Sequence, residues 1–341
     1  MPTAHQIAAL ARLHGMQLTE RITLHADALV DALARQLELV AWDREQLVGQ
    51  LQQRVTQLLD ERPRVREGPP VRVIERRSQP LEAIEAVWSW LRHGRPVRLQ
   101  LEPDACTAAA ELLEDMVSLF PEGVLEVDDG IVAPDEALAD GGVDTPGRRI
   151  AVIDSDADRE LAAYVLARTG LRRNGVDPRA VKIAYAVGDL ELLQRHMRRL
   201  WVGVRVGPAD DPDSFMGPVL PQACEAFLEA HAQWKGHDAV ETWCPGGRLH
   251  RAGDSHCYIA PALFGTQWPA PELPCDGPMV VVVACDDDAQ LREAAEAARK
   301  LDGQVVQIGG RPGLVRHVDR HVRGALLVER LPPGMPEPRP V

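Results

Sequence analysis

Apolar residues recur at helical spacing over the first sixty positions of the chain. Between His5 and Leu59 they fall three or four positions apart, and few glycines or prolines interrupt them. This period lines the apolar side chains along one face of a helix. The pattern therefore predicts at least two amphipathic helices that form an N-terminal helical layer. A charged, proline-marked connection follows over residues 61–70.

Beyond residue 70 the pattern changes to short apolar runs that alternate with longer helical stretches. Runs rich in β-branched residues predict strands at residues 71–74, 97–101, 124–127, 149–153, 181–186, 258–263, 279–284, 304–308 and 324–328. Helical spacing predicts helices at residues 82–92, 106–119, 159–172, 190–201 and 288–301, and one more between the last two strands. Strands that alternate with helices of this length form parallel sheets, so we expect an α/β fold with two doubly wound parallel-sheet domains.

Length and composition are those of an ordinary soluble, two-domain protein. The 341 residues are 45% hydrophobic and 26% charged, with neither a cleavable signal pattern nor an apolar run long enough to cross a bilayer. We therefore expect a cytoplasmic protein without a membrane partner. The six cysteines, at positions 106, 224, 244, 257, 275 and 285, contain no C-x-x-C pair. They are interpreted as reduced, mostly packed thiols, because disulfide scaffolds and structural zinc sites need closer pairing.

The net charge of −13 disfavours a nucleic acid partner, since binding to phosphates requires clustered basic residues. Arginines do gather at positions 62, 64, 66, 72, 76 and 77, but no aromatic residues are interleaved with them. We interpret this segment as a solvated linker or a patch for an acidic partner.

Several motifs occur in a fixed order through the second half of the chain. Residues 156–158 read D-A-D and precede a helical run and the segment N-G-V-D-P-R-A at 174–180. Residues 206–220 read V-G-P-A-D-D-P-D-S-F-M-G-P-V-L. A glycine pair at 246–247, the segment Y-I-A-P-A-L-F at 258–264 and D-G-P at 276–278 follow. Together they resemble the aldehyde dehydrogenase superfamily over most of residues 18–330.

The resemblance implies an aldehyde dehydrogenase-like fold and the following domain organisation. Residues 1–147 would hold the N-terminal helices and a reduced cofactor-type domain. Residues 148–330 would form the catalytic-type domain, and residues 331–341 a proline-rich tail.

Aldehyde oxidation requires a thiolate, a carboxylate base and an amide that holds the oxyanion. The resemblance places Pro178 at the family's nucleophilic cysteine, Asp144 at its base glutamate and Ser78 at its oxyanion asparagine, with Arg77 beside it in place of a tryptophan. A proline side chain has no lone pair with which to attack a carbonyl. A lone aspartate in a loop is more often a turn residue than a base. The sequence thus predicts a degenerate, shortened member that lacks the catalytic cysteine and has no catalytic residues.

The cofactor positions of the family are substituted as well. Gln100 falls at its adenosine-ribose lysine, and Pro274 at its ribose-binding glutamate. Between Val127 and Asp144 the chain is too short for the family's helix and glycine turn, and no G-x-G-x-x-G replaces them. The glycine pairs at 141–142 and 309–310 are interpreted as turns. We expect no cofactor, with NAD(P) bound only if the protein is an active enzyme.

Two polar groups offer other chemistry. His250, Asp254, His256 and Cys257 are close in sequence and could form a metal or Cys/His site, but strand alternation sends His256 and Cys257 to opposite faces. The aspartates at 286–288 follow a strand and precede a helix, where carboxylates cap amides; a Mg²⁺ site is the alternative. We predict structural roles for both groups and no metal site.

The leading hypothesis is a catalytically inactive aldehyde dehydrogenase-like protein that acts as a structural, assembly or regulatory partner of another protein, such as an active enzyme of the same pathway. Similar degenerate domains occur at the C-terminus of some bifunctional proline-catabolic flavoenzymes, which is an analogy of fold alone. One alternative is an NAD(P)-dependent aldehyde oxidoreductase with a rebuilt active site. Another is a small-molecule sensor that uses the interdomain cleft.

Overall fold

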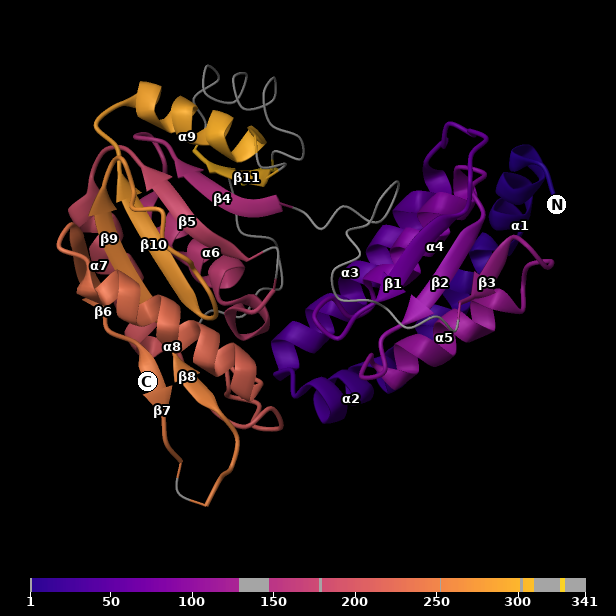
Figure 1. Ribbon diagram of the computed structural model, residues 1–341, viewed down its shortest axis with the longest axis horizontal. Coiled ribbons are helices and arrows are strands. Elements are labelled where there is room, and N and C mark those ends of the chain that lie inside the picture. The colour runs from indigo at the N-terminus through magenta and orange to yellow at the C-terminus, as the bar shows by residue number, and fades with distance from the viewer. Residues whose placement is uncertain are drawn as a thin grey trace. The chain divides into compact units, whose positions relative to one another are not determined.

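The chain divides into two compact units, Met1–Thr145 (unit 1) and Pro146–Val341 (unit 2). The computed structural model (Figure 1) describes residues 2–128, 147–177, 180–251, 253–300, 303–309 and 326–328. Asp144, Pro178, the glycine pair at 141–142, the helix predicted after residue 308 and the tail at 331–341 lie outside the described residues.

Unit 1 begins with three helices, where the sequence predicts at least two. They are α1 (Ala4–Leu24), α2 (Ala26–Leu37) and α3 (Ala41–Asp60). A capping box opens α1: the Thr3 side chain accepts from the Gln6 N–H, and the Gln6 side chain accepts from the Thr3 N–H.

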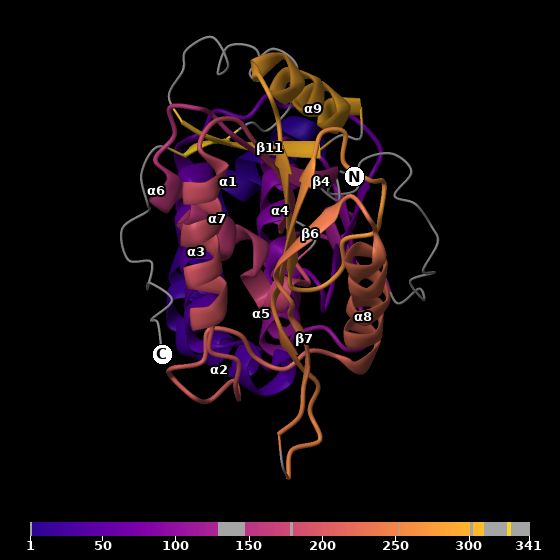
Figure 2. The same cartoon turned by 90° about the vertical axis from the view of Figure 1, so that its left-hand side faces the viewer.

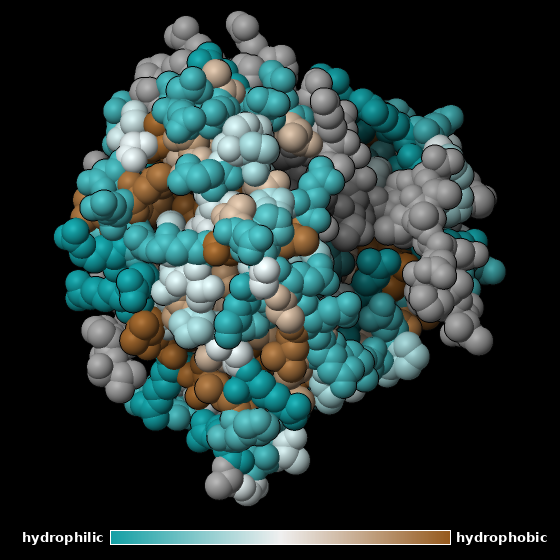
Figure 3. All heavy atoms as spheres, turned by 60° about the vertical axis from the view of Figure 1, so that its left-hand side comes forward, coloured by the Kyte–Doolittle hydropathy of each residue, from teal (hydrophilic) through white to brown (hydrophobic). Residues whose placement is uncertain are grey.

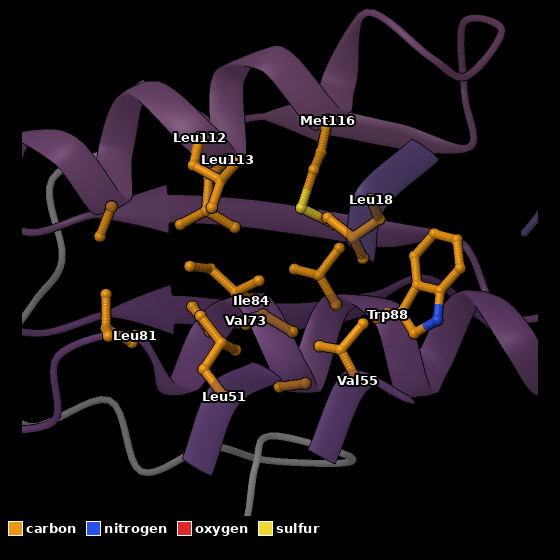
Figure 4. Packing of buried hydrophobic residues seen from close by; sticks show 14 of the residues in the cluster. Leu18, Leu51, Val55, Val73, Leu81, Ile84, Trp88, Leu112, Leu113 and Met116 are labelled. Atoms are coloured by element: carbon orange, nitrogen blue, oxygen red, sulfur yellow. The ribbon is translucent and has the colours of Figure 1, made fainter. Parts of the chain in front are cut away.

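A parallel sheet of three strands in the order β1-β2-β3 follows the helices. Its elements are β1 (Val71–Glu75), α4 (Glu82–Arg92), β2 (Val97–Leu101), α5 (Thr107–Val117) and β3 (Leu125–Val127). All the helices and strands of unit 1 contribute to one hydrophobic core. Figure 4 shows Leu18 of α1 beside Met116 of α5, and Trp88 of α4 near Val55 of α3. The helical layer is therefore part of this core.

The described residues of unit 2 form a larger sheet of seven strands, in the order β12-β11-β4-β5-β10-β9-β6. The strands are β4 (Gly147–Ile153), β5 (Val181–Ala186), β6 (Val240–Cys244), β9 (Ala262–Gln267), β10 (Met279–Ala284), β11 (Gly303–Ile308) and β12 (Leu326–Val328). The helices are α6 (Arg159–Gly170), α7 (Leu190–Gly203), α8 (Pro221–Gly236) and α9 (Asp288–Lys300). The strands β4 and β5 lie side by side in the middle of the sheet, and later strands are added on both sides of them. Every described pairing is parallel except that of the edge strand β6 with β9.

Helices cover both faces of this sheet, with α7 on one side and α8 on the other (Figure 2). The side chains of β10 point alternately to these two faces. Met279, Val281 and Val283 pack in a cluster with Phe227 of α8. Val280 faces the other way, towards Gly170 at the end of α6. A strand buried on both faces needs an uninterrupted apolar run, which explains the V-V-V-V sequence of β10.

The structure corrects the predicted strand at residues 258–263, which is two strands. Pro261 has no N–H to donate and separates β8 (Tyr258–Ala260) from β9. β8 pairs with β7 (Gly247–Leu249) in a separate ribbon, whereas β9 joins the large sheet. Gly247, the second residue of the glycine pair, thus begins a strand.

Within the described part of the chain, no helix is both long and apolar enough to cross a bilayer. On the face shown in Figure 3, apolar residues appear in small separate groups among hydrophilic ones.

Candidate functional site

The segment that precedes β5 has an unusual backbone. Three successive residues, Arg173, Asn174 and Gly175, have positive φ angles of 48°, 57° and 72°. Side chains other than glycine adopt this left-handed conformation only at a cost, so the surrounding contacts must hold the segment in place. This is the segment that the resemblance aligns with the nucleophile loop.

Asn174 supplies two of those contacts. Its buried side chain donates from Nδ2 to the Pro218 carbonyl at 2.9 Å, and its Oδ1 accepts from the Gly217 N–H at 2.7 Å. An amide side chain satisfies a donor and an acceptor at once. Asn174 therefore joins this segment to the M-G-P motif more than forty residues further along the chain.

Gly175 brings in a third motif. A Cβ atom at this position would lie 2.4 Å from Cα of Pro278 and 2.6 Å from the carbonyl carbon of Gly277. Only glycine allows both this approach and the positive φ. The N-G, M-G-P and D-G-P motifs of the sequence therefore meet at the start of β5.

Asp177 closes the segment with a buried ion-pair cluster. Its Oδ2 lies 3.0 Å from Nε of Arg172, and 2.9 Å and 2.7 Å from Nε and Nη2 of Arg173. The side chain of Asp177 is fully buried. Two guanidinium groups compensate this carboxylate, so it holds the backbone immediately before Pro178.

Lys182 follows this segment and is the second residue of β5. Its ammonium group donates to the carbonyl oxygens of Gly175, at 2.5 Å, and of Gly277. Burial lowers the pKa of Lys182 to about 8, although Cys275, Asp276 and Asp177 act in the opposite direction. Lys182 thus joins the N-G and D-G-P motifs and keeps a cation at their junction.

A cavity of about 350 Å³ opens beside Lys182, entirely within unit 2. Residues 175–177 and 275–277, the first halves of β4 and β5, and the first turns of α8 form its walls. It lies at the amino ends of three parallel strands. Sequence reasoning did not find Lys182 or Arg149, which lines the same cavity, because neither belongs to a motif.

The thiols of the chain are mostly packed, as expected. None of the six cysteines forms a disulfide, and Cys106, Cys224, Cys257 and Cys285 are buried. Burial raises the pKa of the Cys106, Cys224 and Cys244 thiols, and that of Cys285 to about 12. A thiol with a raised pKa is a poor nucleophile at neutral pH. Cys275 is the cysteine that lines the cavity.

In unit 1, Gln100 has both ends of its amide occupied. Its Oε1 accepts from Arg72 Nε at 2.6 Å, and its Nε2 donates to Asp128 at 3.2 Å. The residue is 2% exposed. Gln100 therefore links β1 and β2 to the segment after β3, at the position where the family would contact a ribose.

Ser78 is exposed in the turn between Arg76 and Gln79. Its neighbour Arg77 donates from its backbone N–H to Glu102 at 3.0 Å, and from its guanidinium to the Gln36 carbonyl at 2.9 Å. The basic pair at 76–77 is thus engaged in contacts within unit 1.

A buried carboxyl stands beside this turn, and the sequence analysis missed it. Glu75 is 0% exposed and accepts from the N–H groups of Leu81 and Ala83 at the start of α4. Burial raises the pKa of Glu75 to about 8, despite these two hydrogen bonds. The last residue of β1 gave no sequence signal, because an acidic residue at a strand end is commonplace.

The remaining candidates have structural partners. The carbonyl of Pro274 accepts from the Trp234 indole N–H at 2.8 Å. Asp254 accepts from the backbone N–H of His256 at 2.9 Å, from its ring Nδ1 at 2.6 Å and from the Tyr258 hydroxyl at 2.8 Å, and these hydrogen bonds lower the pKa of Asp254 to about 2. Among the described residues, no group of three or more His, Cys, Asp or Glu side chains could hold a metal ion. Asp287 accepts from two N–H groups at the start of α9, as a helix cap does.

Many solved structures resemble this chain, and the most similar include aldehyde dehydrogenases. Methylmalonate-semialdehyde dehydrogenase from Oceanimonas doudoroffii matches with a TM-score of 0.74 and 16% identity, over 94% of this chain and 77% of that one. The 1-pyrroline-5-carboxylate dehydrogenase from Thermus thermophilus matches at 0.71 and 17%, over 96% and 73%. An NAD-dependent benzaldehyde dehydrogenase from Corynebacterium glutamicum matches at 0.73 and 13%, over 96% and 82%.

No family model matches the sequence, and no curated protein sequence matches it. The structural similarity confirms the predicted aldehyde dehydrogenase-like α/β fold. At this level of identity it says nothing of the chemistry, which has to be argued from the residues.

Proposed function

We propose that this chain is an aldehyde dehydrogenase-like protein without dehydrogenase activity, which acts as a structural, assembly or regulatory partner of another protein. The observation that carries the proposal lies in the segment before β5. Asn174 and Gly175 retain the contacts that bring three motifs together, yet the sequence has no cysteine between Cys106 and Cys224. No shift of alignment within this segment would therefore supply a thiol.

The polar groups at the other family positions are also poorly suited to the reaction. Asp144 has a shorter side chain than the glutamate whose position it takes. Ser78 is exposed in a turn and carries a hydroxyl where the family has an amide. An oxyanion is stabilised by a preorganised donor, which in the family is an amide and which the Ser78 hydroxyl does not reproduce.

The described cofactor positions do not fit a nicotinamide dinucleotide. The family's lysine donates to a ribose, whereas the Gln100 amide is already bonded to Arg72 and Asp128. Pro274 has no polar side-chain atom to replace a glutamate. Binding a cofactor in the family's manner would break the two hydrogen bonds of the buried Gln100 amide.

The outer face of α1 supports a role in protein binding. Leu13, Met16 and Leu24 are 71%, 71% and 81% exposed. At 100° per residue they lie on one side of the helix, opposite the buried Leu18 and Ile22. The exposed Glu20 lies on the same side of the helix, so this face offers apolar contacts and one charge to a helix or groove of another protein.

The loss of activity is tested with thermal-shift titrations of NAD⁺ and NADP⁺ to millimolar concentration, beside turnover assays on an aldehyde panel. We expect neither a shift nor turnover, whereas an active aldehyde dehydrogenase in the same assays serves as a positive control. A ligand at a hundred times its Kd stabilises its protein by about 2.7 kcal/mol, which such a titration detects. A saturable shift accompanied by turnover would refute the proposal.

The binding role is tested by placing a photo-reactive amino acid at Met16 in the producing cells. We expect one discrete adduct, whose partner is identified by mass spectrometry and reconstituted with the purified chain. Glu111, exposed on α5, is the matched control position and should give no such adduct. Identical adducts from both positions, or none from Met16, would contradict the proposed surface.

A second candidate is an NAD(P)-dependent oxidoreductase with a rebuilt site. The observation that favours it is that Cys275 and Lys182 line the same cavity, where the cation would stabilise a thiolate. The similar solved structures are themselves named as dehydrogenases. This candidate requires turnover that Cys275→Ser abolishes and Cys244→Ser, a change outside the cavity, leaves unchanged.

A further inference from the structure

The cavity of unit 2 contains a cation whose hydrogen bonds within the protein go to neutral acceptors. Lys182 donates to two backbone carbonyls, and an ammonium group has three N–H donors. Among the described residues, none accepts the third. The charge of this half-buried group is therefore not neutralised by a carboxylate at hydrogen-bond distance within the described part of the chain.

Neither of the two carboxylates that line the described wall of the cavity is hydrogen-bonded to Lys182. Asp177 is already bonded to two guanidinium groups, those of Arg172 and Arg173. Asp276 is exposed at the rim. Arg149 adds a second cation to the cavity wall. Because the hydrogen bonds of Lys182 within the described residues go only to carbonyl oxygens, its charge favours a ligand that carries negative charge.

The remainder of the wall is apolar. Ile150, Val176 and Ile183 line it, and Ala223 and Ala226 of α8 contribute small side chains that leave room. A volume of about 350 Å³ is at the lower end of the range for small-molecule sites, roughly 300–1,000 Å³. The cavity thus combines a cationic end with a short hydrocarbon wall.

We propose that this cavity binds a small organic carboxylate, with the carboxylate group at Lys182 and a short hydrocarbon chain against Ile150, Val176 and Ile183. A phosphate would satisfy the cations but leave the apolar wall uncovered. A neutral chain would cover the wall but leave Lys182 without a charged acceptor. The inference goes beyond the proposed function, because it requires neither a thiol nor a nicotinamide cofactor and no reaction takes place.

Calorimetric titration of the full chain with butyrate, butyramide and inorganic phosphate tests the ligand class. We expect saturable binding of butyrate and at least tenfold weaker binding of the other two probes. Butyramide has nearly the same size and shape but no charge, so equal affinity for butyrate and butyramide would overturn the role of Lys182. Phosphate binding as tight as that of butyrate would overturn the role of the apolar wall.

The site is assigned with Lys182→Met, which should weaken butyrate binding at least tenfold. Lys235→Met is the control, because Lys235 is exposed on α8 and does not line the cavity; it should leave binding unchanged. Equal loss in both variants, or none in either, would contradict the assignment.

A second measurement does not depend on the folding of a variant. The chain has lysines only at positions 182, 235 and 300, so amine acylation can be followed site by site by mass spectrometry. We expect butyrate, but not butyramide, to protect Lys182 from acylation and to leave the rate at Lys235 unchanged. Absence of protection at saturating butyrate would overturn the proposal, whatever the outcome of the cofactor titrations.

Discussion

Two features require glycine at position 175. Its φ is +72°, and the backbone of Gly277 and Pro278 lies directly against its Cα. We predict that Gly175→Ala destabilises unit 2 by roughly 2–4 kcal/mol, from the left-handed backbone and the clash together. Calorimetry should show a melting temperature lower by about 5–10 °C.

Gly236→Ala is the matched control within unit 2. A Cβ atom added at Gly236, the last residue of α8, would meet nothing within 4 Å. The change should alter stability by less than about 1 kcal/mol. If the two variants melted at the same temperature, the close approach of the N-G and D-G-P motifs would not be a structural requirement.

Glu75 makes the stability of unit 1 depend on pH. The pKa of its carboxyl is raised from 4.5 to about 8, chiefly by burial, so between these values the folded state binds a proton that the unfolded state has lost. Stability should therefore fall as pH rises through this window, by up to about 1.4 kcal/mol per pH unit. At and below pH 4.5 the contribution is fully present.

Glu75→Gln should remove this slope, because the amide does not ionise. Its oxygen can accept from the Leu81 N–H, whereas its NH2 group replaces the oxygen that accepts from the Ala83 N–H. Denaturation midpoints at pH 5, 7 and 9 check the prediction: we expect the stability of Glu75→Gln relative to the parent protein to increase from pH 5 to pH 9. Parallel pH profiles for the two proteins would show that Glu75 does not titrate in this range.

At the scale of elements, α1 has a buried apolar face and, on its other side, exposed apolar side chains. Leu18 is 0% exposed and lies in the core with Met116, whereas Met16 is 71% exposed. We predict that Leu18→Ala costs about 2–5 kcal/mol, because it leaves a cavity. Met16→Ala should stay within about 0.5 kcal/mol. Chemical denaturation of both variants checks this, and a comparable cost for Met16→Ala would mean that its face is covered.

The order of most elements was predictable from the sequence because their hydrophobic periods are clear. The strand at 279–284 and the helix at 82–92 have the predicted bounds. The strands β6 and β7 were not predicted. They are short and largely exposed, so their sequences do not alternate between apolar and polar residues. Pro261 divides β8 from β9 because it has no N–H to donate to a sheet. The proline is visible in the sequence, but the apolar residues on both sides of it favoured the prediction of one continuous strand.

The candidate site was less predictable. Sequence motifs located the segment at 174–177 and the glycines that approach it, since glycine and asparagine are the residues that tolerate such a backbone. The motifs could not locate Lys182, which is placed at the site by its hydrogen bonds to the carbonyl oxygens of Gly175 and Gly277. Contacts between loops far apart in sequence depend on strand order, which a single lysine in a strand does not reveal.

Over the whole molecule, hydrophobic burial is organised in separate clusters. The core of helices and three strands belongs entirely to unit 1, and the clusters around β10 and β4 belong entirely to unit 2. A unit with its own core can unfold as a cooperative unit of its own. We therefore predict two calorimetric transitions for the full chain.

The single-residue variants assign these transitions. Leu18→Ala should lower one transition and Gly175→Ala the other, because each change perturbs the core or backbone of one unit only. The variant that combines both should show the two shifts added, within about 0.5 kcal/mol. A single transition that both changes lower equally would instead mean that the units fold as one, and the loss of either core would then remove the α1 surface and the Lys182 cavity together.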